Sequence, residues 1–210
     1  MLSNQHINDK KSALRRRVRA GLKKISTDER RQLSSQACER LKRQAVWRDA
    51  NAVLLYVPLA DELDVWELAS EILAGGKILA LPQFSPERGV YIAAMVKSPE
   101  KSLKTGRFGI REPDESCPPI ELKRLDLALV PGVAFDFAGR RLGRGKGFYD
   151  QLLKLVRGTT VGVAFDEQIV SEVPVGSNDI RVNCILTPTR WKVCDATSAR
   201  SLNDSFGEHL

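Results

Sequence analysis

The N-terminal part of the chain has the apolar spacing of two amphipathic helices. Apolar residues recur at intervals of three and four over residues 9–25, which predicts a helix there. Its apolar stripe consists of Leu14, Val18, Leu22 and Ile25. A capping pair, Ser26 with Glu29, predicts the start of a second helix that ends near residue 43. Because both helices have an apolar face, we expect them to pack on the rest of the protein.

Beyond residue 50 the pattern changes to short apolar runs that alternate with helical spacing. Strands are predicted at 52–57, 77–81, 90–96, 125–130, 160–165 and 183–187. Helices are predicted at 65–73 and 148–156. Strands that alternate with helices favour an α/β fold: a mainly parallel open sheet flanked by helices, preceded by the N-terminal helical pair.

Three polar segments leave the carboxyl ends of these predicted strands: residues 56–64, 82–86 and 131–149. In an open parallel sheet, ligands bind along that edge. We therefore expect the three segments to meet at one site.

Length and composition fit one globular domain over residues 1–210. The chain is 42% hydrophobic and 28% charged. Within it we expect residues 1–48 to form a basic helical arm packed on the domain and residues 195–210 to be a frayed tail. No run approaches the ~20 apolar residues of a membrane span, and the N-terminus lacks an apolar signal core. We expect a cytoplasmic monomer with no membrane partner.

The net charge of +7 is unevenly distributed. Residues 1–48 contain 14 Lys and Arg but 4 Asp and Glu, a net of +10, so the rest of the chain is slightly acidic. A basic arm is compatible with nucleic-acid binding. We favour a solvated polar helix face for most of these residues, and we expect no nucleic-acid partner.

Cysteine and histidine offer little chemistry. The four cysteines, Cys38, Cys117, Cys184 and Cys194, lack the close spacing of a metal site or disulfide framework. The two histidines, His6 and His209, stand near the chain ends. Catalysis here must therefore rely on carboxylates, cations, backbone groups and a bound ion.

Residues 141–150, RLGRGKGFYD, form the most informative segment. Three glycines alternate with two cations, and an acid follows. Glycine lets successive backbone N–H groups turn toward one anion, and Arg and Lys supply opposing charge. The segment is not a Walker A loop, because Arg140 stands where its first glycine belongs, and it lacks the third glycine of the dinucleotide fingerprint. A solvated loop, or an RNA-contacting segment, would have a similar composition. The predicted strand before it and helix after it favour an anion-binding loop.

This segment and the strand before it resemble the 5-formyltetrahydrofolate cyclo-ligase family. The run LVPGVAFD at 129–136 and the run GRRLGRGKGFYD at 139–150 are similar to the signature of that family. Other landmarks follow its order: KSALR at 11–15, the acidic DELD at 61–64, GIREP at 109–113, and Asp179 as a late acid. The resemblance covers residues 11 to 187.

The resemblance implies ATP-dependent cyclisation of 5-formyltetrahydrofolate to 5,10-methenyltetrahydrofolate, with ATP as co-substrate and Mg²⁺ as cofactor. It implies that ATP binds Lys11, Ser12, Ala13, Leu14, Arg15, Arg141, Leu142, Gly143, Arg144, Gly145, Lys146, Gly147, Phe148 and Tyr149. Arg144 and Lys146 are the expected catalytic cations. Asp150 and Asp179 are the expected metal ligands, although Asp150 would also suit a helix cap and Asp179 a turn.

By the same resemblance, the reduced folate would bind Tyr56, Leu59, Asp64 and residues 144–148. A solvated acid or a helix cap is the alternative for Asp64. The chain departs from the family at Val65, where Thr is usual, and at Phe148, where Tyr is frequent. Two other functions stay open: a diverged ATP-binding paralogue with another substrate, and a basic RNA-binding protein.

Overall fold

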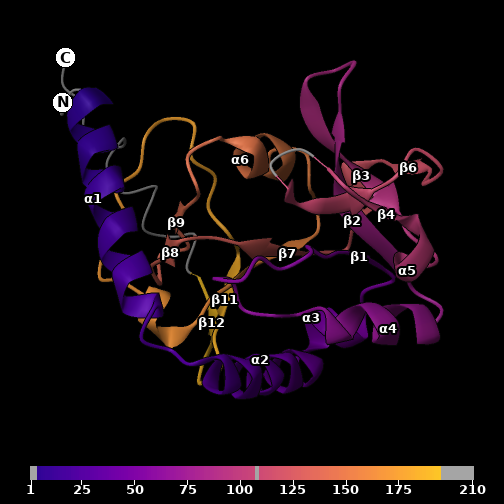
Figure 1. The fold of residues 1–210 in the computed structure, drawn as a ribbon, viewed down its shortest axis with the longest axis horizontal. Coiled ribbons are helices and arrows are strands. Elements are labelled where there is room, and N and C mark those ends of the chain that lie inside the picture. The colour runs from indigo at the N-terminus through magenta and orange to yellow at the C-terminus, as the bar shows by residue number, and fades with distance from the viewer. Residues whose placement is uncertain (1–3, 107–108, 195–210) are drawn as a thin grey trace, which may run out of the picture.

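A mixed sheet of eight strands forms the centre of the protein (Figure 1), whose computed structural model describes residues 4–106 and 109–194. Across the sheet the strands are β12 (Trp191–Val193), β11 (Cys184–Leu186), β10 (Thr159–Val163), β7 (Leu127–Pro131), β1 (Ala52–Leu54), β2 (Ile78–Ser85), β3 (Val90–Met95) and β6 (Pro119–Ile120). The five strands from β11 to β2 are parallel to their neighbours within that group. The predicted α/β fold with a mainly parallel sheet is confirmed.

Helices cover both faces of this sheet. The α-helices are α1 (Asn4–Leu22), α2 (Thr27–Lys42), α3 (Ala45–Arg48), α4 (Glu67–Ala74), α5 (Pro99–Ser102) and α6 (Phe148–Leu153), and α3 and α5 are single turns of four residues. The first four contribute to one apolar core, and α6 packs in a second core on the opposite face. None of the described helices is long and apolar enough to cross a membrane.

The N-terminal arm is docked on the domain, as its stripe predicts. Leu14, Val18 and Leu22 are buried in the same core as the strands, and α2 begins after Ser26, whose hydroxyl accepts the Glu29 N–H at 3.2 Å. Arg30 secures the end of the arm: its guanidinium donates to the Leu22 carbonyl and lies 5.3 Å from the centre of the Phe165 ring. This docking brings α1 to the carboxyl edge of the sheet.

Strand lengths differ from the predicted ones at the central pair. Strand β1 ends at Leu54, three residues earlier than predicted, whereas β2 continues to Ser85. Strand β3 returns beside β2 in antiparallel register, with Ser85 opposite Val90. A connection of four residues permits only antiparallel pairing, since a parallel crossover needs a dozen residues or more.

A hairpin separates β7 from the glycine loop. Strands β8 (Ala134–Phe135) and β9 (Arg141–Leu142) pair here, and β4 (Leu103–Thr105) pairs with β5 (Arg111–Pro113) elsewhere. Asp136, 1% exposed, holds the first hairpin by accepting bonds from the N–H groups of Ala138, Arg140 and Val173 and from the Arg140 side chain. A buried carboxylate with this many donors fixes the turn that presents Arg141.

Candidate functional site

A cavity of about 780 Å³ opens at the carboxyl ends of β1 and β7. The three segments predicted to meet there, 56–64, 82–86 and 131–149, all contribute to its wall. Additional walls come from α1, from residues 110–112 and from the segment that contains Asp179. The parallel strands therefore bring the predicted site together as their shared edge requires.

One face of α1 borders the cavity. Asn8, Lys11 and Arg15 line it, at the three- and four-residue spacing of one helical face. Ser12, Ala13 and Leu14, which the resemblance included among the ATP contacts, do not line the cavity. Leu14 is instead buried in the core. Consecutive residues of a helix point in different directions, so they cannot all face one ligand. Of the five residues of α1 that were predicted to bind ATP, only Lys11 and Arg15 line the cavity.

The glycine loop faces these two cations. Every residue from Arg141 to Asp150 lines the cavity. Gly145 and Gly147 have φ of 106° and 69°, a region that disfavours residues with a Cβ atom. The Arg15 Nε donates a 2.8 Å hydrogen bond to the carbonyl oxygen of Gly143. Helix α6 then begins at Phe148, as predicted, although it ends at Leu153 rather than residue 156.

Arg144 is held between two carboxylates of the segment that follows β1. Its Nε lies 3.1 Å from Glu62 Oε1, and its Nη2 lies 2.5 Å from Asp61 Oδ1. Burial by itself would lower the pKa of Arg144, but the bonds to Asp61 and Glu62 outweigh it and raise that pKa. These bonds hold the guanidinium of this loop residue against the segment that follows β1.

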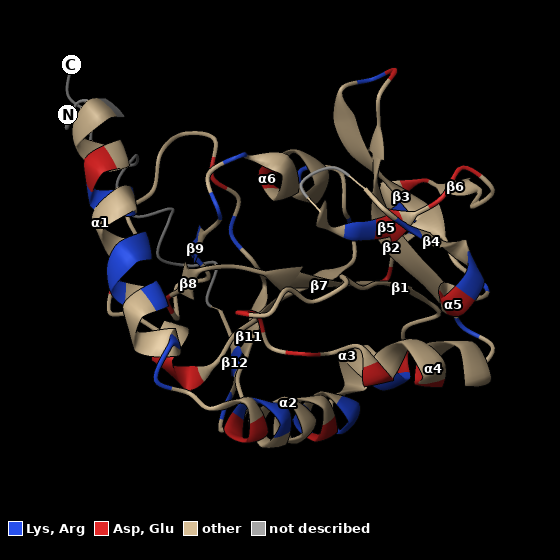
Figure 2. Ribbon diagram, viewed as in Figure 1, with Lys and Arg blue, Asp and Glu red and all other residues tan. Residues whose placement is uncertain are grey.

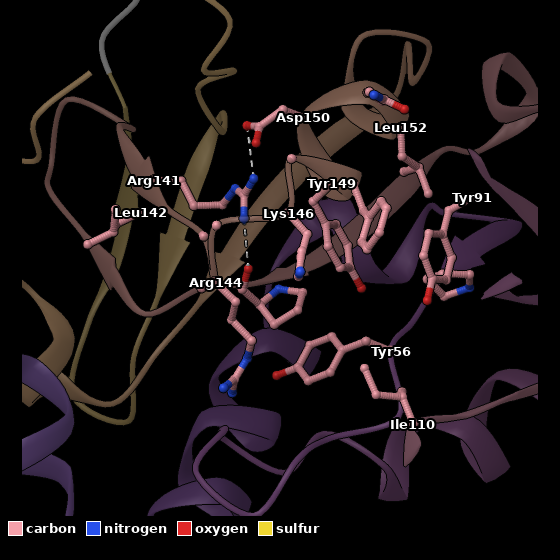
Figure 3. A pocket seen from close by; sticks show the side chains of 18 of the residues that line it. Tyr56, Tyr91, Ile110, Arg141, Leu142, Arg144, Lys146, Tyr149, Asp150 and Leu152 are labelled. Atoms are coloured by element: carbon pink, nitrogen blue, oxygen red, sulfur yellow. Dashed lines mark hydrogen bonds and ion pairs between the residues drawn. The ribbon is translucent and has the colours of Figure 1, made fainter. Parts of the chain in front are cut away.

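The two predicted metal ligands are each paired with a predicted ATP ligand. Asp150 Oδ1 lies 2.9 Å from Arg141 Nη2 (Figure 3). Asp179 Oδ2 lies 2.5 Å from Lys11 Nζ. The N–H of Ile180 donates to Asp150 Oδ1 at 3.3 Å, which brings the two acids into one corner of the cavity. Among the described residues, no three or more His, Cys, Asp or Glu side chains form a group that would hold a metal by themselves.

Aromatic rings form another part of the wall (Figure 3). Tyr56, Tyr91, Phe148 and Tyr149 line the cavity. Tyr56 is fixed by a 2.8 Å bond from its hydroxyl to the Leu63 carbonyl. The Tyr91 and Phe148 rings lie 4.9 Å apart between centres. Burial raises the pKa of Tyr149, so this hydroxyl stays protonated at neutral pH. The Lys146 ammonium extends into the space between Arg144 and these rings (Figure 3).

Asp64 is not among the residues that line the cavity, contrary to its expected role as a folate ligand. Its carboxylate accepts the Trp66 N–H at 2.8 Å, in a turn just before α4. The sequence left a cap of this helix as one alternative for Asp64, but the N-cap position is Trp66 and it has no side-chain capping bond. Leu59 lines the cavity as expected. The neighbouring Val65 is fully buried in the core, so the departure from Thr does not alter the cavity wall.

Several cavity residues had no role assigned from the sequence, among them Glu62, Tyr91 and Glu112. Glu62 belongs to the quoted acidic segment, but the pattern does not distinguish it from Asp64. Tyr91 lies in a predicted strand, and its sequence context gives no indication that it belongs to a site. Glu112 belongs to the GIREP landmark, and its carboxylate is buried beside Phe84, whose N–H it accepts at 3.2 Å. Side-chain direction, which no short pattern encodes, decides all three.

Comparison with known proteins gives a consistent result. The model of the 5-formyltetrahydrofolate cyclo-ligase family matches residues 7–188. The 5-formyltetrahydrofolate cyclo-ligase of Escherichia coli K12 is 30% identical over 180 residues, which cover 83% of this chain and 99% of that protein. The mouse 5-formyltetrahydrofolate cyclo-ligase is 28% identical over 86% of this chain and 94% of its own length.

A solved structure agrees with these relatives. The 5,10-methenyltetrahydrofolate synthetase of Aquifex aeolicus superposes with a TM-score of 0.79 at 37% identity, covering 95% of this chain and 99% of that one. The match extends over both the arm and the sheet that form the cavity. The chain belongs to the 5-formyltetrahydrofolate cyclo-ligase family.

Proposed function

We propose that this cavity cyclises 5-formyltetrahydrofolate to 5,10-methenyltetrahydrofolate at the expense of ATP, by phosphorylating the formyl oxygen. One observation carries the proposal: a single cavity joins the cations of α1 and of the glycine loop to a wall of aromatic rings. The cations suit a triphosphate, and the rings suit a planar pterin. Both substrates of the family's reaction therefore have a complementary surface within one site.

The chemistry explains why a phosphoryl donor is needed. A formamide carbonyl is a poor electrophile, and its oxygen is a poor leaving group. Transfer of the γ-phosphoryl group to that oxygen breaks the bond to ADP and activates the formyl carbon. The folate N10 then attacks this carbon and loses its proton, and the carbon–oxygen bond breaks as phosphate departs. Phosphoryl transfer asks the protein mainly for positioning and charge neutralisation.

Each group of cavity residues has a role in this proposal. Lys11, Arg15 and the loop 141–149 would bind the triphosphate, with Arg144 and Lys146 beside the transferred group. Arg144 is already oriented by Asp61 and Glu62. Tyr56, Leu59, Tyr91 and Phe148 would pack on the folate. Glu62 takes over the part first expected of Asp64, because its carboxylate faces the cavity and could accept the donor edge of an aminopyrimidine.

The acids Asp150 and Asp179 fit a magnesium ion that is shared with the nucleotide. Each uses one carboxylate oxygen in the bonds to its cation and to backbone N–H groups, which leaves the second oxygen outside those bonds. Mg²⁺ in nucleotide sites takes one or two protein carboxylates and completes its shell with phosphate and water oxygens. A bound Mg²⁺ would neutralise the charge that develops on the phosphates.

The alternatives have less support. Val65, the departure that suggested a diverged paralogue, does not line the cavity. An RNA-binding role would need an open surface of cations, whereas Lys11, Arg141 and Arg144 line a cavity and each lies beside a carboxylate. Acids placed this close would repel a long polyanion.

The decisive experiment follows near-ultraviolet absorbance of methenyltetrahydrofolate with purified protein, 5-formyltetrahydrofolate, Mg²⁺ and ATP. We expect the absorbance to rise only when ATP is present. In Lys146→Ala the rate of this rise should fall by a factor of about 10² or more, which is the cost of removing one preorganised donor. Lys97→Ala, an exposed lysine outside the cavity, is the matched control. No rise despite ATP binding would favour the paralogue, and absence of ATP binding would overturn the assignment of the glycine loop.

A further inference from the structure

The two acids assigned to the metal are also the partners of two cations assigned to the phosphates. In the pair of Lys11 with Asp179, the side chains are 13% and 19% exposed. In the pair of Arg141 with Asp150, they are 3% and 17% exposed. Ion pairs shielded to this degree are screened only slightly by salt, and each partner depends on the other for neutralisation.

This arrangement places opposing charges where a nucleotide and a metal would each bind. A triphosphate without metal would gain Lys11 and Arg141 as partners, but it would also lie beside the uncompensated charges of Asp150 and Asp179. A metal ion without nucleotide would meet the reverse problem, because Lys11 and Arg141 would stay beside it with no phosphate to neutralise them. Like charges brought together in a shielded site oppose binding strongly.

We propose that Asp150 and Asp179 make nucleotide binding depend on the metal. They would repel metal-free ATP, and they would hold Lys11 and Arg141, the cations that it needs as partners. When metal and triphosphate enter together, the second oxygen of each carboxylate would be available to the metal, and Lys11 and Arg141 would gain phosphate partners. If either ligand entered alone, one set of these charges would lie beside a ligand of the same sign without neutralisation. The inference rests on the proposed ATP site and goes beyond it, because it assigns these acids an unfavourable effect on metal-free ATP.

The geometry links the two pairs into one unit. Asp179 is followed by Ile180, whose N–H donates to the same Asp150 oxygen that accepts Arg141. The two ion pairs therefore belong to one hydrogen-bonded unit. Arg144 differs, because its partners Asp61 and Glu62 lie on the segment after β1 and make no bond to this unit among the described residues.

The test measures the dissociation constant of ATP by calorimetry in EDTA and, separately, in excess Mg²⁺. The variants are Asp150→Asn and Asp179→Asn, which keep the shape and the backbone hydrogen bond of each side chain. We expect both to bind ATP more tightly than the wild-type protein in EDTA and more weakly in Mg²⁺. A coupling between two ligands of this kind is typically about 5- to 150-fold, and we expect it to shrink in both variants.

Asp28→Asn is the matched control, since it removes the same charge from a side chain that is 92% exposed on α2. It should leave both dissociation constants unchanged, which separates a local effect from one of net charge. Unchanged or weaker ATP binding in EDTA by both cavity variants would overturn the inference.

A second measurement needs only the wild-type protein. Binding of Mn²⁺, followed by its paramagnetic resonance signal, should be weak without nucleotide and strengthened when ATP is present with the protein. Mn²⁺ binding to the protein alone that is as tight as with ATP would also overturn the inference. Failure of wild-type protein to bind ATP even in Mg²⁺ is a different result, because it would reject the proposed nucleotide site itself.

Discussion

The side chain of Arg15 and the backbone of Gly143 are joined by a 2.8 Å hydrogen bond from Nε to the carbonyl oxygen. The two residues are separated by 128 positions in the sequence, so the docking of α1 decides where the glycine loop begins. Burial lowers the pKa of Arg15, yet a guanidinium remains charged at neutral pH. One arginine thus supplies charge to the cavity and support to its loop.

Replacing Arg15 with Ala should weaken ATP binding. The change removes a cavity cation and a charge-assisted bond worth about 1.5–3 kcal/mol, so we expect a loss of roughly tenfold or more in affinity. Arg16→Ala is the control, since Arg16 is exposed on the same helix and does not line the cavity. Titration calorimetry with Mg²⁺ and ATP would measure both. Equal losses in the two variants would show that only the net charge of the arm matters.

Replacing Glu62 with Gln should reduce kcat/KM for the folate, whereas Asp64→Asn should not. Glu62 is 8% exposed at its side chain and bonds to Arg144 inside the cavity, so loss of its charge leaves that arginine partly uncompensated. We expect a decrease of roughly tenfold or more. Asp64 contacts the backbone before α4, and Asn forms the same kind of turn. Steady-state kinetics on both variants distinguishes the cavity acid from the acid of the turn before α4, and the reverse ranking would restore Asp64 as the folate ligand.

Alanine substitutions at two glycines, Gly147 and Gly89, should distinguish an effect on protein stability from an effect on ATP binding. Gly147 and Gly89 have φ of 69° and 65°, and neither has an atom within 4 Å of the position that a new Cβ would take. Alanine at either should therefore lower the free energy of unfolding by a similar amount, about 1–2 kcal/mol, measured by denaturant titration.

Only Gly147 lines the cavity, so we expect Gly147→Ala alone to weaken ATP binding as well. Comparable ATP affinity in both variants would indicate that the backbone at Gly147 does not approach the phosphates.

The buried thiols should be unreactive. Burial raises the pKa of Cys38, Cys117 and Cys184, so at a given pH the thiolate, which is the reactive form, is scarcer than for an exposed thiol. At pH 8 we expect iodoacetamide to leave these three unmodified in the folded protein and to label them after denaturation, as measured by mass spectrometry. Activity should persist after the treatment. Rapid labelling of Cys38 in the folded protein would contradict its burial.

The sequence alone determined the fold class and most of the segments that line the cavity. Short apolar runs between helical segments specify strands and helices because burial requires those periodicities. The loop from Arg141 to Asp150 was singled out by its glycines, which encode local backbone geometry directly, and every one of its residues lines the cavity. The stripe of α1 likewise predicted that the arm packs on the domain.

Only the tertiary structure decided which residues near each motif line the cavity. Lys11 and Arg15 reach the cavity while Leu14 enters the core, and Glu62 faces the cavity while Asp64 turns toward α4. Such choices depend on the docking of one element against another, which one-dimensional patterns do not contain. The ion pairs of the cavity have the same origin, because Lys11 and Asp179 meet across 168 positions of the chain through packing alone.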